Sequence, residues 1–97
     1  MKGVVFMDYN ELAQEIISIG KQFKVTEINF NNAYKEYIIS RLDDFKYVET
    51  LIDIFEKYRF KIFINRADKK RLKNLLIELN KIKVMLFIDE TLLEKAK

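Results

Sequence analysis

Apolar residues recur at helical spacing in three parts of the chain. Each stripe places one side chain on the same face every three or four residues, which predicts an amphipathic α-helix. The first stripe follows Asp8, an N-cap candidate with Glu11 three residues later, and the second follows Asp43 and Asp44, which break or cap the segment before it. The stripes are Leu12, Ile16, Ile19 and Phe23; Phe45, Val48, Leu51, Ile52 and Phe55; and Leu72, Leu75, Leu76 and Leu79.

Between these stripes the pattern is typical of β-strands. Residues 4–7 and 84–88 are continuous apolar runs, as expected for strands buried on both faces, and 84–88 is predicted to be the most buried strand. Residues 25–30 alternate between apolar and polar positions, which favours a half-exposed or edge strand, and residues 60–64 are also predicted to be a strand. Asp89 would then open a last short helix.

The segment at 31–39 fits two structures. If its two leading asparagines cap a helix, Tyr34, Ile38 and Leu42 form the apolar stripe of that helix. If they form a two-residue hairpin turn, residues 33–39 are instead a returning strand. We favour the helix.

Strands that alternate with helices predict a small α/β fold. We expect a single domain over residues 1–97, with a mostly parallel sheet of about four strands and flanking helices, or a mixed sheet if the hairpin forms. A chain of 97 residues has room for one core. Its 49% hydrophobic content, with eight Phe and five Tyr, is generous for that core, so we also predict a homodimer face.

The absence of Cys and His excludes several kinds of chemistry. Neither Ser-His-Asp nor Cys-His catalysis is possible, nor is a zinc site of the ordinary type. Two glycines do not suffice for a phosphate-binding glycine loop. We therefore expect no cofactor, and binding rather than catalysis. A chain without Cys, a signal-peptide pattern or a membrane-spanning apolar stretch is predicted to be cytoplasmic.

An alternative function rests on two acidic residues that follow apolar runs. Asp8 follows residues 4–7 and Asp89 follows residues 84–88, so adjacent parallel strands would bring both to one sheet edge. Residues 4–12, Val-Val-Phe-Met-Asp-Tyr-Asn-Glu-Leu, resemble the first motif of the PIN and NYN nuclease families, and Asp89-Glu90 resembles their later acidic motif.

The resemblance implies a minimal nuclease that depends on a divalent metal ion. In it Asp8 and Asp89, supported by Asp68 or Glu90, would hold the ion that activates water. The alternative is that Asp8 and Asp89 are helix caps, with Glu11 completing a capping box.

Positive charge is concentrated in one region. Residues 59–83 carry nine basic and two acidic side chains, whereas the whole chain has a net charge of +3. Basic and aromatic side chains that alternate along a strand, followed by a basic helix, can track a phosphate backbone and stack a base. The region is therefore predicted to bind nucleic acid or an acidic protein surface. The predicted binding residues are Arg59, Lys61, Phe63, Arg66, Lys69, Lys70, Arg71 and Lys73.

Exposed tyrosines are a further candidate for partner contacts. Tyr combines an apolar ring with a polar tip and so suits a half-buried place at an interface. The candidates are Tyr34, Tyr37, Tyr47 and Tyr58. In its small size and its scarcity of reactive residues, the chain resembles the accessory proteins of viruses and mobile elements. These include inhibitors of host defence, which also act by binding.

Overall fold

The computed structural model describes residues 8–32, 34–60 and 64–96, with side chains described up to Asp89 except that of Asn31. All regular structure in these residues is helical, so the predicted α/β fold is wrong. The elements in chain order are α1 (Tyr9–Gln22), the short 3-10 helix η1 (Phe30–Asn32), α2 (Lys35–Arg41), α3 (Phe45–Arg59) and α4 (Arg66–Ala96).

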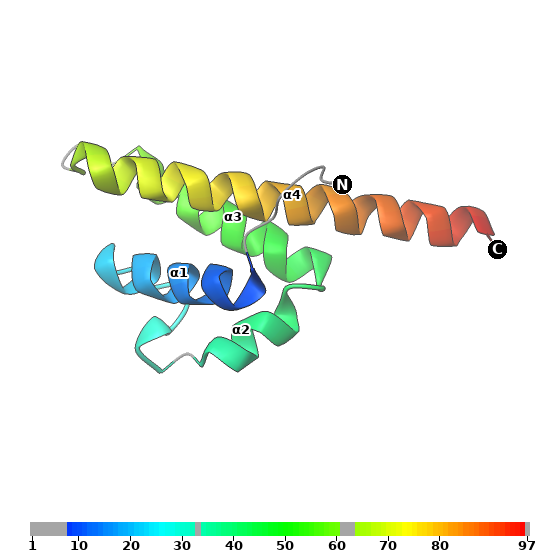
Figure 1. Ribbon diagram of the computed structural model, residues 1–97, viewed down its shortest axis with the longest axis horizontal. Helices are drawn as coiled ribbons and strands as arrows, with labels where there is room; N and C mark the ends of the chain where they lie inside the picture. Colours follow the sequence, from blue (N-terminus) through cyan, green and yellow to red (C-terminus); the bar gives the residue numbers. More distant parts are fainter. Residues whose placement is uncertain (1–7, 33, 61–63, 97) are drawn as a thin grey trace.

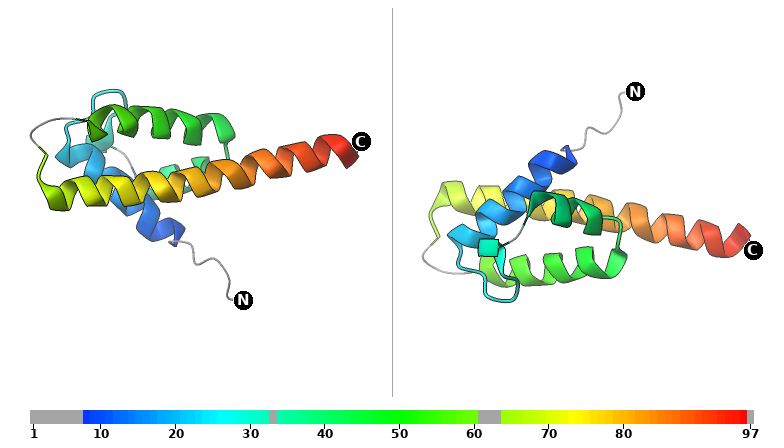
Figure 2. Two further views of the ribbon diagram at one scale, coloured as in Figure 1. Left: turned by 90° about the horizontal axis from the view of Figure 1, so that it is seen from above. Right: turned by 90° about the horizontal axis from the view of Figure 1, so that it is seen from below.

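The four α-helices in this part of the chain are arranged around α3 and α4. These two run antiparallel and lie side by side, while α1 crosses below them and α2 packs against α1 (Figure 1). The carboxyl-terminal part of α4 projects beyond the other helices in all three views (Figures 1 and 2). The molecule is consequently elongated, with principal extents of 48 × 29 × 22 Å.

Capping side chains begin two of the described helices, α1 at Asp8, as predicted, and α3 at Asp44. Asp8 accepts a hydrogen bond from the backbone N–H of Asn10 at 3.1 Å, and Asp44 accepts one from that of Lys46 at 3.0 Å. Each bond satisfies a donor that the first helical turn leaves without a partner. The choice of a helix over a strand within 31–39 is confirmed, because α2 occupies Lys35–Arg41, but the predicted cap is wrong: Tyr34 is the N-cap residue, and the two asparagines belong to η1.

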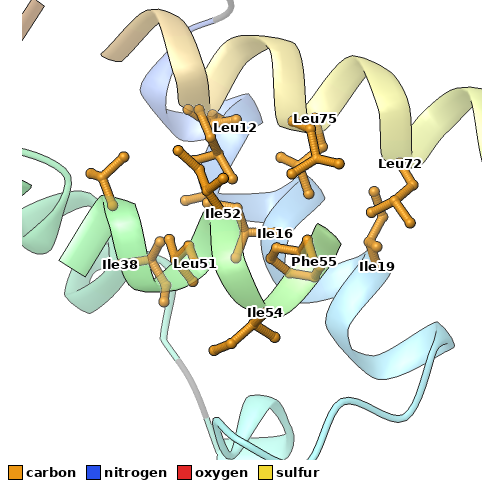
Figure 3. Close-up of a cluster of buried hydrophobic side chains, with 14 of the residues drawn as sticks. Leu12, Ile16, Ile19, Ile38, Leu51, Ile52, Ile54, Phe55, Leu72 and Leu75 are labelled. Atoms are coloured by element: carbon orange, nitrogen blue, oxygen red, sulfur yellow. The ribbon is translucent and has the colours of Figure 1, made fainter. Parts of the chain in front are cut away.

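The predicted helical stripes form the core. Leu12, Ile16 and Ile19 of α1 face the stripe of α3 and the leucines of α4, as the close-up shows (Figure 3). A fully buried Leu, Ile or Phe stabilises the fold by roughly 1.5–3 kcal/mol, so these contacts dominate. Phe55 at the centre of α3 is fully buried. Tyr34, predicted to belong to the α2 stripe, is instead 74% exposed.

The strand predicted at 25–30 is a connecting segment that lies on the core. Val25 and Phe30 are buried and Ile28 is half-buried, whereas Thr26 and Asn29 are exposed, so burial along the segment does not follow the alternation of a strand. Glu27 fastens the segment to α3: it accepts hydrogen bonds from Lys57 Nζ at 2.7 Å and from the Tyr58 hydroxyl at 3.0 Å. The hydrogen bond from Lys57, followed by one from backbone N–H, lowers the pKa of Glu27 to about 2.

The strand predicted at 84–88 is part of α4. Leu79, Ile82 and Leu86 continue the inward stripe of that helix through the run, so a helix buries part of the run without a sheet. Val84 is 55% exposed, which also contradicts the prediction of a fully buried segment. Asp89 consequently lies inside a helix rather than at its start.

Two other predicted strands are not tested in full. Residues 4–7 and 61–63 lie outside the described residues. Phe60, where the second of these was predicted to begin, is the C-cap residue of α3. Among the described helices, none is both long and apolar enough to cross a membrane.

Candidate functional site

A basic groove lies between the end of α3 and the first half of α4. It has a volume of about 580 Å³. Five of the side chains that line it are cationic, and all five belong to the predicted binding residues. The lining residues are Arg59, Arg66, Lys69, Lys70, Lys73, Asn74 and Ile77.

The helical period explains why α4 gathers its cations on one side. Arg66, Lys69, Lys70 and Lys73 are spaced three or four residues apart, so they share a face two turns long. The leucines at 72, 75, 76 and 79 form the adjacent face of the helix and are buried. Burial of the leucine stripe therefore holds the cationic face toward solvent.

The groove carries charge that the protein itself does not neutralise. Within the described residues, no acidic side chain forms an ion pair with Arg66, Lys69, Lys70 or Lys73. Arg59 differs, since its guanidinium lies 3.5 Å from a Glu56 carboxylate oxygen. Four exposed cations within two turns repel one another, so an anionic ligand is the natural complement of this surface.

Arg71 points away from the groove, toward α1. Its guanidinium donates two hydrogen bonds to the Glu15 carboxylate, at 2.9 and 3.0 Å, and one to Gln22 at 3.0 Å. The bond with Glu15 is the main cause that raises the pKa of Arg71. This bidentate pair joins α1 to α4, so Arg71 has a structural role that sequence reasoning missed.

Phe60 lies beside the groove and is 73% exposed. The Arg59 guanidinium carbon lies 5.5 Å from the centre of the Phe60 ring, within the range of a cation–π contact. Phe63 was the aromatic residue predicted to stack a base, but Phe63 and Lys61 lie outside the described residues. Recognising that Lys57 and Arg59 form a basic last helical turn would have placed Phe60 at a helix end instead of in a strand.

The acidic residues of the nuclease alternative are separate. Asp8 caps α1, while Asp89 is exposed on the projecting part of α4, and the sheet edge that would have joined them is not present in the described residues. Asp68 accepts a hydrogen bond from the side-chain amide of Asn65, and the side chain of Glu90 is not among the described side chains. The described residues contain no group of three or more acidic side chains able to hold a metal ion.

The candidate tyrosine anchors divide into two pairs. Tyr34 and Tyr37, around the start of α2, are exposed. Tyr58 is buried and bonded to Glu27, and Tyr47 is half-buried beneath the Arg41 guanidinium, 5.0 Å from its ring centre. Burial, with a smaller contribution from Tyr37, raises the pKa of Tyr47. The exposed pair lies on α2 and does not adjoin the lining of the basic groove.

Comparison with family models, curated proteins and solved structures finds no match to this chain. The functional argument therefore rests on the geometry of the groove.

Proposed function

We propose that the protein binds nucleic acid through the basic groove. The observation that carries the proposal is the face of α4 on which Arg66, Lys69, Lys70 and Lys73 lie exposed without acidic partners in the described residues. A polyanion that neutralises such a face releases its condensed counterions, which favours binding at low salt. The predicted cytoplasmic location, which rests on composition, is a compartment where such ligands are abundant.

Phe60 favours a single strand over a duplex as the ligand. An exposed ring at the edge of a cationic groove provides a stacking platform for an unpaired base, while the cations contact the backbone. Bases inside a duplex are already stacked and cannot use the ring. The proposed mode is weakly dependent on sequence, since every base has a face to stack.

Two single variants with the same charge change test the proposal. Lys70→Gln removes a cation from the groove, whereas Arg71→Gln removes one that faces α1. Fluorescence anisotropy with a labelled single strand should show binding that weakens steeply as salt rises. For Lys70→Gln the slope of log affinity against log salt should flatten by about 0.7, and for Arg71→Gln it should change little.

A third variant separates stacking from charge. Phe60→Ala should weaken binding by about 1–3 kcal/mol for one stacked base and leave the salt slope unchanged. Failure of the wild-type protein to bind single-stranded DNA or RNA at low salt would refute the proposal. In that case the groove would be left with the other predicted ligand, an acidic protein surface.

A further inference from the structure

The carboxyl-terminal half of α4 exposes a group of apolar side chains to solvent. Val84, Met85 and Ile88 are 44–55% exposed, and Phe87 is 61% exposed although its ring also contacts that of Phe45. We call these four residues the apolar end of α4. No charged residue interrupts the sequence between Lys83 and Asp89. Clusters of this kind on a small protein mark a contact surface.

We propose that the apolar end of α4 binds a second copy of this chain. A two-fold symmetric contact pairs a patch with itself, and an uncharged apolar helix face is complementary to its own copy. Each exposed side chain leaves on the order of 100 Å² of apolar surface, which gives about 800 Å² for a pair of copies. With a surrounding polar rim, the interface reaches the lower limit of about 1,000 Å² for specific contacts, so the dimer is weak.

The charges of α4 determine the orientation of the two helices. The groove cations lie on the same solvent face of the helix as Val84 and Ile88, about four turns earlier. Parallel packing would set the two cationic faces against each other. Antiparallel packing around residue 86 separates the two grooves by about 50 Å, well beyond the screening length of about 10 Å. The contact is therefore antiparallel.

Sedimentation velocity over about 1–200 µM tests the interface. Wild type should change from monomer to dimer within this range, and Val84→Glu with Ile88→Glu should weaken association at least tenfold. Both sites are exposed, so the variant should keep its helical circular dichroism and its melting temperature at low concentration. The matched control replaces two other exposed apolar residues, Tyr34→Glu with Tyr37→Glu, and should associate as wild type does.

The orientation is tested by a single spin label. The chain has no Cys, so Asn74→Cys provides a unique attachment site on the exposed face of α4. Antiparallel helices place the two labels about 35–40 Å apart, whereas parallel helices bring them within about 20 Å. A short distance would overturn the antiparallel arrangement.

Two results would overturn the dimer itself: wild type that stays monomeric over the whole range, or a control variant that associates as poorly as the Glu variant. If the monomeric wild type binds phosphatidylglycerol vesicles and the Glu variant does not, the apolar end of α4 is assigned to a lipid surface instead.

Discussion

Gly20 lies inside α1, where glycine is less favourable than alanine by about 1 kcal/mol. The reason for glycine here is the ring of Phe30, which packs directly on the helix. A Cβ atom at position 20 would lie only 2.6 Å from Phe30 Cγ. Phe30 is itself buried, with its ring centre 6.1 Å from that of Phe55. The missing side chain thus lets the segment after α1 close over the core.

Gly20→Ala should destabilise the protein, despite the higher helix propensity of alanine. Displacing the Phe30 ring from a packed core should cost about 1–3 kcal/mol, which exceeds the gain in propensity. Urea unfolding measures the difference. Gln14→Ala, at an exposed position of the same helix, is the control and should be neutral or stabilising. A Gly20→Ala protein as stable as that control would show that the contact with Phe30 is not tight.

Glu27 makes the stability of the fold depend on acid pH. Its pKa is lowered from 4.5 to about 2, chiefly by the hydrogen bond from Lys57, so folding favours the ionised carboxylate. The resulting stabilisation is complete above the unfolded pKa and is lost as the pH falls from about 4.5 through about 2.

Glu27→Gln should therefore flatten the dependence of the unfolding free energy on pH in that window. The reason is that the amide does not titrate, while the carboxylate of the wild type does. Glu36→Gln, at an exposed carboxylate on α2, is the control. Chemical denaturation at a series of pH values makes the comparison, and identical profiles for wild type and Glu27→Gln would contradict the prediction.

At the scale of elements, α4 shows why a continuous apolar run is ambiguous. Five apolar residues at 84–88 have no period of their own, so they fit a buried strand as well as a helix. The inward stripe of Leu79, Ile82 and Leu86 crosses the run in helical phase, and packing of this stripe decides the outcome. The residues of the run that are out of phase with this stripe, Val84, Met85, Phe87 and Ile88, are left exposed.

Alanine substitutions distinguish the two structures. In the helix, Val84→Ala and Ile88→Ala remove side chains that are about half exposed and replace β-branched residues by a better helix former. Each variant should be within about 0.5 kcal/mol of wild type, measured at a protein concentration too low for association. In a buried strand the same changes would cost about 1–4 kcal/mol. A loss of that size would refute the helical assignment.

At the scale of the whole molecule, α4 separates two surfaces. The basic groove lies between the end of α3 and the first half of α4, while the apolar end lies in the second half of α4, next to the start of α3, where Phe87 contacts Phe45. Lys83 approaches Glu49 at 3.9 Å and Lys81 pairs with Glu78, so the basic residues between the two surfaces are largely neutralised. The two proposals therefore concern different residues and can fail independently.

The sequence by itself determined the amphipathic helices and the cap of the first one. Stripes at helical spacing and the cap at Asp8 depend on local geometry, which a single segment contains. It also located the excess of basic residues, including those that line the groove.

Tertiary structure decided the rest, because the rest depends on what packs against each segment. Residues 25–30 alternate as a strand would, yet they form a loop and a 3-10 turn, because Val25 and Phe30 are buried against helices and no neighbouring strand is described. Arg71 lies among the basic residues in sequence, but the helical period turns it toward Glu15 while Lys70 faces the groove. Local pattern determines which residues can share a face, and packing of the core determines which face meets water.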